Sequence, residues 1–377
     1  MRIAIITNST SYEPRVDLIV AFFQRNGHNV TRIESNFIHR EKVIRDKPAE
    51  NTIYIDTIPY KRNLSFRRLF SHYNFAKKVY KLLNAQMYDL IYVLIPANAL
   101  LKFAAIYKNS NPEVKLVADV IDLWPESLPF RYFKKVWPFT LWASLRNDNL
   151  CKCDYLILEC GLYQMILKKY IEKVKKSVIY WPRKVTLECP DFTGKESELN
   201  ICYLGSINNI IDIDFINKLT IELNRIMKTV LHIIGDGEKK DKFLSELSAA
   251  GISYMYYGSI YDEYKKIEIL SQCDYGLNIM KESVCVGVTM KSVDYMHAGL
   301  PMINNIGGDI WQLIETYTLG INCKRGPYVD IAKRIVNDRL KMRKNRCNIR
   351  LLYERFFSEE AYNRQMQKCM NELLIDK

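Results

Sequence analysis

The sequence has few of the residues that metal sites require. It contains only five histidines, and none lies at a metal-ligand spacing from another. Its ten cysteines include no pair of C-x-x-C elements with downstream histidines. Many of these cysteines fall within apolar runs, which is typical of reduced thiols that pack as small hydrophobic groups. We therefore expect no metal site, no cofactor and an intracellular protein with reduced cysteines.

Long apolar runs are also missing. The opening residues, MRIAIITNS, contain an apolar run of at most six residues, which is too short for the core of a secretory signal. No later window approaches the eighteen uncharged apolar residues that a membrane span needs. We expect a cytoplasmic protein that is either soluble or peripheral on the inner face of the cytoplasmic membrane.

The length and the net charge of the chain limit the number of domains and the kinds of partner. A chain of 377 residues with 48% hydrophobic residues suits two domains, each with its own core. The net charge of +13 favours anionic partners. Nucleic acid, acidic lipid headgroups and sugar nucleotides all meet that condition, so the charge alone does not choose between them.

Strand and helix patterns alternate along the chain. The run Ile3–Ile6 is typical of a buried strand, the helical periodicity after it ends at Asn26-Gly27, and a strand resumes over Asn29–Ile33. Such alternation is typical of a parallel sheet covered by helices. It continues to about residue 180 and starts again at Asn200.

The interruption between these two stretches predicts the domain boundaries. Residues 181–198 combine proline, glycine and charge, as linkers do. We therefore predict a first α/β domain over 1–180, a linker over 181–198 and a second α/β domain over 199–355. A C-terminal helix over 356–377 either closes the second domain or crosses back to the first.

In the second domain, three predicted strands each lead into a glycine. Glycine allows a tight turn and a close approach of backbone N–H groups to a phosphate. A single glycine of this kind is more often a plain turn residue, but three in one domain favour a nucleotide pocket. The three loops contain Gly205-Ser206, Gly235-Asp236-Gly237 and Gly258-Ser259.

A fourth loop is more specific. It places Val288 and Thr289 at the start of a helix, where unpaired backbone N–H groups attract a diphosphate. Lys291 in the first turn adds a positive charge, and Asp294 lies three residues further on the same face. Asp294 could accept hydrogen bonds from two ribose hydroxyls. The alternative is a surface ion pair between Lys291 and Asp294.

These motifs resemble those of the retaining glycosyltransferases of GT-B family four. The matching segments of the second domain are YLGS (203–206), HIIGDGEKKDKF (232–243), YYGSIYDEYKKIEILSQCDYGLNIM (256–280) and KSVDYMHAGLPMIN (291–304). Those of the first domain are EPRV (13–16) and DVIDLWPESL (119–128), the latter similar to a loop of polysaccharide-assembly enzymes. The resemblance implies an α/β GT-B fold, in which two Rossmann-like domains with parallel sheets face each other across a cleft.

The resemblance also implies a reaction. A UDP- or GDP-sugar would be the donor, and its sugar would pass to the acceptor with retention of configuration and without a metal. The catalytic candidates are Asp122, Glu126 and Lys291, and Arg15 and Trp124 would lie on the acceptor side. The first of the family's paired glutamates falls at Val286 here and the second at Asp294. Glu282 is therefore the candidate for contacting the donor sugar.

Similar enzymes build lipopolysaccharide, O-antigen and capsule, often on polyprenyl-diphosphate-linked saccharides. Basic and aromatic residues interleave over 61–81 and 130–146, a pattern that suits an anionic membrane surface but also fits ordinary packed helices. The alternatives are a GT-B nucleotide-sugar epimerase and a non-catalytic nucleotide-binding partner subunit. Nucleic-acid binding has no motif in its support, so we expect no nucleic-acid partner.

Overall fold

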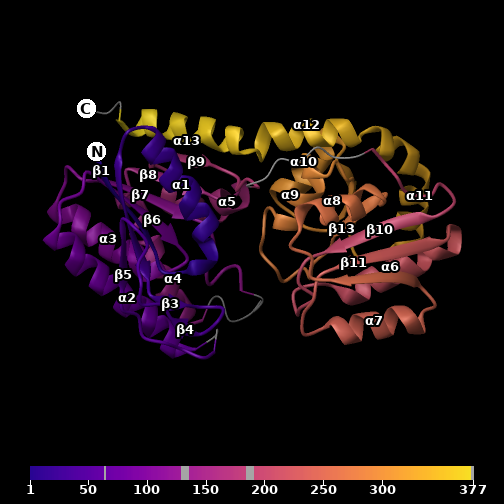
Figure 1. Cartoon of the computed structure of the whole chain (residues 1–377), viewed down its shortest axis with the longest axis horizontal. Helices are drawn as coiled ribbons and strands as arrows, with labels where there is room; N and C mark the ends of the chain where they lie inside the picture. The colour runs from indigo at the N-terminus through magenta and orange to yellow at the C-terminus, as the bar shows by residue number, and fades with distance from the viewer. Residues whose placement is uncertain (63–64, 129–135, 184–190, 375–377) are drawn as a thin grey trace. The chain divides into compact units, whose positions relative to one another are not determined.

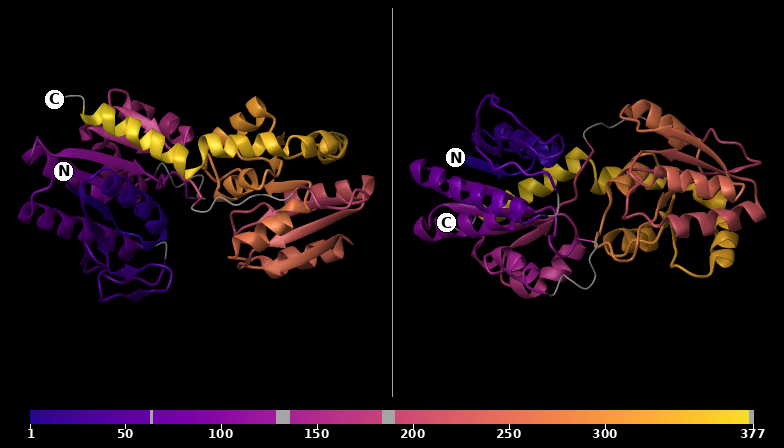
Figure 2. Two further views of the ribbon diagram at one scale, coloured as in Figure 1. Left: turned by 45° about the horizontal axis from the view of Figure 1, so that its top comes forward. Right: turned by 90° about the horizontal axis from the view of Figure 1, so that it is seen from below.

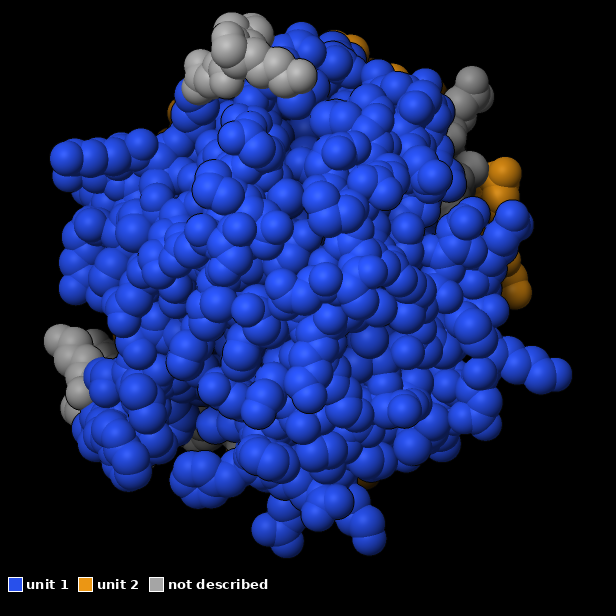
Figure 3. Space-filling view, turned by 90° about the vertical axis from the view of Figure 1, so that its left-hand side faces the viewer, with its two compact units in different colours: residues 1–181, 363–377 blue, residues 182–362 orange. Residues whose placement is uncertain are grey.

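The computed structural model describes residues 1–62, 65–128, 136–183 and 191–374. It divides into two compact units, which are coloured separately in Figure 3. Unit 1 contains Met1–Trp181 and Asn363–Lys377, and unit 2 contains Pro182–Tyr362. Each unit is built around one parallel sheet with its own hydrophobic core.

The sheet of unit 1 has seven parallel strands in the order β5-β2-β1-β6-β7-β8-β9. Central strand β1 pairs with β2 on one side and β6 on the other, so that Ile3 lies opposite both Val30 and Leu90. All six residues of β6 are buried, as expected for a strand covered on both faces. The strands are β1 (Arg2–Thr7), β2 (Asn29–Ser35), β5 (Thr52–Ile55), β6 (Leu90–Ile95), β7 (Lys115–Val120), β8 (Tyr155–Leu158) and β9 (Lys176–Val178).

Helices flank this sheet, and a small hairpin extends from it (Figure 1). Helix α2 packs along α3, which also contacts α4. The helices are α1 (Glu13–Arg25), α2 (Phe66–Ala85), α3 (Asn98–Ser110), α4 (Phe139–Asn147) and α5 (Gly161–Ile171), with short 3-10 turns η1 (Thr10–Tyr12) and η3 (Leu150–Lys152). The hairpin pairs β3 (Phe37–Ile38) with β4 (Val43–Ile44).

The sheet of unit 2 has six parallel strands in the order β12-β11-β10-β13-β14-β15. The chain winds outward from β10 to β12 and then returns to the other side of β10 with β13. These strands are β10 (Leu199–Leu204), β11 (Thr229–Ile234), β12 (Ser253–Gly258), β13 (Tyr275–Asn278), β14 (Met302–Asn304) and β15 (Gly320–Asn322). The helices are α6 (Ile213–Ile226), α7 (Lys240–Ala249), α8 (Glu263–Ser271), α9 (Met290–His297), α10 (Asp309–Tyr317), α11 (Tyr328–Lys344) and α12 (Arg346–Phe356).

The last helix, α13 (Glu359–Leu374), begins in unit 2 and ends in unit 1. In Figures 1 and 2 it is the yellow helix that leads to the C-terminus. Within unit 1 it is fixed by Glu372, whose carboxylate accepts a hydrogen bond from the Tyr155 hydroxyl at 2.7 Å. The Glu372 carbonyl also accepts one from Lys175 at 3.0 Å.

The predicted elements are present, with shifted ends. Periodicity places a helix over Tyr73–Leu83, whereas α2 begins at Phe66 because the Ser65 hydroxyl caps it by accepting the Arg68 N–H at 3.2 Å. Part of the predicted linker, residues 184–190, lies outside the described residues.

Candidate functional site

In unit 2 the winding of the sheet reverses beside β10. Ligands of open parallel sheets bind beyond the carboxyl ends of the strands at such a reversal. Here those ends belong to β10 and β13, and they lead into the Gly205 loop and into the loop before α9. The topology therefore brings two of the predicted loops to the same edge of the sheet.

Helix α9 begins with a capping box. The Thr289 hydroxyl accepts the Ser292 N–H at 3.2 Å, and the Ser292 hydroxyl accepts the Thr289 N–H at 3.2 Å. The Thr289 hydroxyl also donates to Asn278 at the end of β13, at 2.8 Å. The Thr289 amide, predicted as a phosphate donor, is thus engaged within the box. The next amides, those of Met290 and Lys291, come before the first intrahelical bond.

Lys291 carries a buried ammonium group in this first turn. Its residue is 8% exposed, and the Nζ atom lies 4.8 Å from the centre of the Tyr203 ring on β10. Burial lowers the pKa of Lys291 from 10.5 to about 8. Among the residues that the structure describes, no carboxylate or hydrogen-bond acceptor pairs with it. A cation held in this way at the end of the sheet is suited to bind an anion.

Asp294 lies in the same helix but has partners of its own. Both of its carboxylate oxygens accept hydrogen bonds from the guanidinium of Arg183, one of them at 2.5 Å. Lys266 on α8 adds a third contact at 3.9 Å. Since both Lys291 and Asp294 are buried and Asp294 pairs with these two residues, the alternative of a surface Lys291–Asp294 ion pair is wrong.

The glycine turns of unit 2 pack against one another. A Cβ atom on Gly235 would lie 2.0 Å from the Gly205 carbonyl oxygen, so no other residue fits there. The Gly205 amide donates to Ile234 at 2.9 Å, and the Gly235 amide donates to Gly258 at 2.7 Å. The close approach of backbones explains Gly235, whereas a Cβ atom on Gly205 would meet nothing within 4 Å and its φ of 120° is what favours glycine there. A role for their loops in phosphate binding stays a prediction.

The remaining predicted residues of unit 2 are less informative. The Gly237 amide donates to the Asp236 side chain at 2.7 Å, and the Ser206 carbonyl accepts the Tyr203 hydroxyl at 2.8 Å. Glu282 is exposed in the loop between β13 and α9. Val288 and Ser259 belong to the strand-end loops as expected, and donor binding by any of these residues stays a prediction.

In unit 1 the predicted residues gather at the carboxyl ends of β1 and β7. Arg15 is fully buried and binds Asp119 through two hydrogen bonds of 2.8 Å. Asp122 accepts a hydrogen bond from the Tyr12 hydroxyl. Burial raises the pKa of Asp122, and the bond from Tyr12 lowers it in part. The Asp119 pair explains the burial of Arg15, while its contact with an acceptor stays a prediction.

The loop after Asp122 is held by backbone contacts. The Trp124 carbonyl accepts hydrogen bonds from Asn98 at 2.9 Å and from Arg146 at 2.7 Å. Arg146 also pairs with Glu126 at 2.6 Å. The Trp124 ring is half-buried, and the Arg68 guanidinium lies 4.4 Å from its centre. Glu126 and Trp124 therefore lie on one ordered loop with Asp122.

The sequence interpretation missed Glu159. It is the first residue after β8, and its amide donates to Val120 at the end of β7, at 3.1 Å. Burial is the main cause that raises its pKa to about 8, with Arg15 opposing this rise and the charges of Asp122 and Asp119 adding to it. A carboxyl group that stays protonated near neutral pH can donate as well as accept a hydrogen bond. The signal was available, because an acid directly follows the buried run YLIL.

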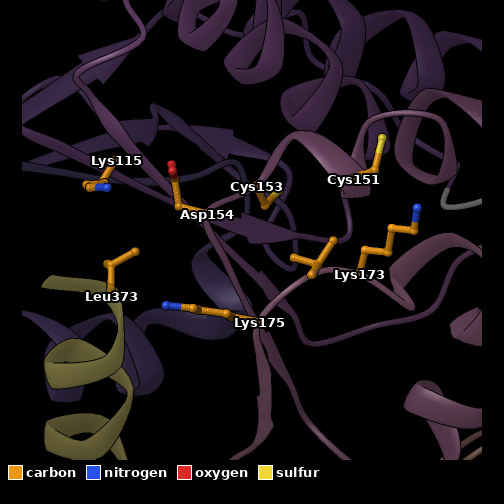
Figure 4. Close-up of a pocket in the computed structure, with 8 residues that line it drawn as sticks. Lys115, Cys151, Cys153, Asp154, Lys173, Lys175 and Leu373 are labelled. Carbon is orange, nitrogen blue, oxygen red and sulfur yellow. The ribbon is translucent and has the colours of Figure 1, made fainter. Parts of the chain in front are cut away.

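A cavity of about 160 Å³ lies elsewhere in unit 1 (Figure 4). It is lined by Lys115 at the start of β7, by Asp154 just before β8, and by Leu373 of α13. These positions are at the amino ends of the strands, so the cavity is separate from the carboxyl-end residues. Asp154 is already paired with Lys108 at 3.0 Å.

Comparison with known proteins identifies the fold. No protein-family model and no curated protein matches this sequence. Among solved structures, sucrose-phosphate synthase from Thermosynechococcus elongatus is similar with a TM-score of 0.72 at 14% identity, covering 100% of both chains. The lipopolysaccharide outer core galactosyltransferase WaaB in its apo form has a TM-score of 0.69 at 17% identity, covering 99% of this chain and 100% of that one. Anabaena HepE in complex with UDP and glucose has a TM-score of 0.64 at 13% identity, covering 98% and 99%. The predicted fold class, GT-B with two Rossmann-like domains, is confirmed.

Proposed function

We propose that this chain is a glycosyltransferase whose unit 2 holds the diphosphate of a nucleotide-sugar donor. The observation that carries the proposal is Lys291, a buried cation at the start of α9 beside the reversal of the sheet. A buried charge is costly unless a partner compensates it. The donor diphosphate supplies that partner, and the solved structure of HepE, which shares the fold, contains UDP.

The proposed reaction depends on stabilising the negative charge that develops on the leaving diphosphate. Breaking the bond between C1 of the sugar and the diphosphate oxygen leaves negative charge on that oxygen. Lys291 and the first amides of α9 stabilise this charge without requiring a metal. A new bond forms between C1 and the acceptor oxygen, and the departing phosphate takes the acceptor proton. Attack from the side of the leaving group retains the configuration at C1.

In this proposal, Asp294 binds the ribose of the donor. Its carboxylate accepts two hydrogen bonds from Arg183 and keeps further lone pairs for ribose hydroxyls. Arg183 thus positions Asp294 before the donor arrives. Because Asp294 is one methylene shorter than the glutamate of similar enzymes, the ribose would approach α9 more closely.

The acceptor side lies in unit 1, with Asp122 and Glu126 orienting the attacking hydroxyl. The acceptor is a lipid-linked saccharide of surface-polysaccharide assembly, in keeping with the fold shared with a lipopolysaccharide galactosyltransferase. Phe66 and Phe70 on α2 are 77% and 60% exposed, and α2 also carries exposed basic residues. Exposed aromatic rings beside cations suit an anionic membrane surface. Within the described part of the chain, no helix is long and apolar enough to cross a membrane.

Calorimetric titration with UDP-, GDP-, ADP- and CMP-sugars tests the donor site. We expect one nucleotide to bind the wild type and to bind Lys291→Met at least tenfold more weakly, since a charge-assisted contact contributes about 1.5–3 kcal/mol. Lys242→Met, on an exposed face of α7, is the matched control and should bind normally. The proposal fails if no nucleotide binds, or if Lys291→Met binds as tightly as the control.

A further inference from the structure

A cluster of cationic and aromatic side chains surrounds Tyr60 in unit 1. We name it the Tyr60 cluster, and its members are His39, Lys42, Tyr60, Arg68, His72 and Trp124. The Tyr60 hydroxyl lies 2.9 Å from Nδ1 of His39. The Lys42 ammonium lies 5.0 Å from the centre of the Tyr60 ring, and the Arg68 guanidinium lies 5.7 Å from it. Two full positive charges therefore flank one aromatic ring.

The β3–β4 hairpin and helix α2 supply the two positive charges beside the Tyr60 ring. Lys42 lies in the turn between β3 and β4 with a left-handed backbone, φ 61°. Its ammonium is 3.3 Å from Nδ1 of His39. Burial, together with the charges of Arg68, Lys42 and Arg40, lowers the pKa of His39 to about 4. Burial and the charge of Arg68 also lower the pKa of Lys42. An anion that contacts Lys42 and Arg68 would interact favourably with both positive charges.

His72 gives a second and independent observation. Its Nε2 atom accepts a hydrogen bond from Nε of Arg68 at 3.4 Å, so the ring proton of the neutral imidazole belongs on Nδ1. His72 is 5% exposed, and Nδ1 has no hydrogen-bond partner among the described residues. A buried donor without an acceptor is unusual in folded proteins. The His72 ring contacts Tyr60 and stacks on Trp124, which places this donor within the cluster.

The Tyr60 cluster adjoins the residues assigned to the acceptor. Arg68 lies over the Trp124 ring, and Trp124 follows Asp122 by two residues. The charge of Arg68 also acts on Asp122 and on Tyr12, its hydrogen-bond partner. Lys42 and Arg68 are only partly buried. A ligand group that reaches them would therefore lie beside the Asp122 loop.

We propose that the Tyr60 cluster binds the diphosphate of the acceptor, with Lys42 and Arg68 as cations and Nδ1–H of His72 as a hydrogen-bond donor. The diphosphate that links a lipid to a saccharide carries one negative charge on each phosphoryl group and has non-bridging oxygens that accept hydrogen bonds, which match two cations and one donor. A carboxylate offers one charge and matches them less well. This inference rests on the proposed function, because it assigns the cluster to the acceptor of that reaction.

Calorimetric titration with inorganic pyrophosphate and with geranyl diphosphate tests the inference. It uses the full chain with Lys291→Met as background, so that the donor site of unit 2 does not contribute. We expect both compounds to bind, and Arg68→Gln or Lys42→Gln to weaken binding on the order of tenfold. Lys77→Gln removes an exposed charge from the same helix and should bind like the background. Lys42→Gln leaves the Arg68–His72 bond in place, which guards against a folding artefact.

The outcomes separate the two proposals. Equal binding by Arg68→Gln, Lys42→Gln and Lys77→Gln would overturn the cluster as a phosphoryl site. Binding of pyrophosphate but not of geranyl diphosphate would overturn the assignment to a lipid-linked acceptor. The donor titration is independent, because Arg68→Gln should leave nucleotide binding by the wild-type unit 2 unchanged. Failure of nucleotide binding with intact pyrophosphate binding would count against the proposed function alone.

Discussion

Replacing Lys291 with methionine should have opposite effects on stability and on donor binding. The pKa of Lys291 is lowered from 10.5 to about 8, a difference of about 2.5 that corresponds to about 3.4 kcal/mol. Because the pKa of the folded state is the lower one, the unfolded chain binds the proton more tightly. Stability is therefore reduced in full below pH 8 and recovers as the pH rises toward 10.5. Methionine retains the apolar stem and removes the buried charge.

Urea unfolding at pH 7 should then show Lys291→Met to be more stable than the wild type by up to about 3 kcal/mol. The difference should shrink as the pH approaches 10.5. Lys242→Met, which removes an exposed charge, should be close to the wild type at every pH. Donor binding by Lys291→Met should fall at the same time.

Proton uptake gives an independent check. A bound diphosphate raises the pKa of Lys291, so binding at pH 8 should take up as much as half a proton in the wild type. Calorimetry in buffers with different ionisation enthalpies measures this number, and Lys291→Met should show less uptake. A Lys291→Met variant that is less stable than the wild type and binds nucleotide equally well would contradict the role assigned to Lys291.

Further predictions concern the other buried charges and the exposed face of α2. Arg183→Gln leaves the buried Asp294 without its main partner and should lower the free energy of unfolding by roughly 2–4 kcal/mol, with little added loss in Arg183→Gln/Asp294→Asn. Because the folded pKa of Glu159 is raised from 4.5 to about 8, its stability contribution is full below pH 4.5 and is lost as the pH rises through 8. Glu159→Gln should therefore match the wild type at pH 5 and exceed it at pH 9 by roughly 2–4 kcal/mol in urea unfolding. Phe66→Ser/Phe70→Ser should reduce co-sedimentation with anionic vesicles several-fold, and equal sedimentation would argue against a membrane role for α2.

The sequence predicts both sheets because each depends on local patterns. Buried runs such as Ile3–Ile6 and Leu90–Leu94 are uniformly apolar, as strands covered on both faces must be. The start of helix α9 at Met290 also depends on local sequence, because Thr289 and Ser292, three residues apart, form its capping box. Topology then follows from right-handed parallel connections, and with it the edge at which the candidate site lies.

The partners of the site residues depend on contacts distant in sequence. Arg183 and Asp294 are 111 residues apart, and Tyr12 and Asp122 are 110 residues apart. No periodicity encodes such pairs, because they arise only when the strands assemble. Glu159 could have been found by the rule that polar residues after buried strands gather at one edge. Only the structure reveals that Gly235 packs against the Gly205 carbonyl, because a turn glycine and a packing glycine look alike in sequence.

Turnover of the donor tests the proposed glycosyl transfer most directly. Proton NMR of the donor's anomeric signal, recorded with the wild type, Lys291→Met and Lys242→Met, measures cleavage of the C1–oxygen bond in the presence of a lipid-linked saccharide acceptor. We expect the wild type and Lys242→Met to consume one nucleotide sugar and to give a product of retained configuration, and we expect Lys291→Met to be at least tenfold slower. Consumption at the same rate by Lys291→Met, or no consumption of any nucleotide sugar by the wild type, would contradict it.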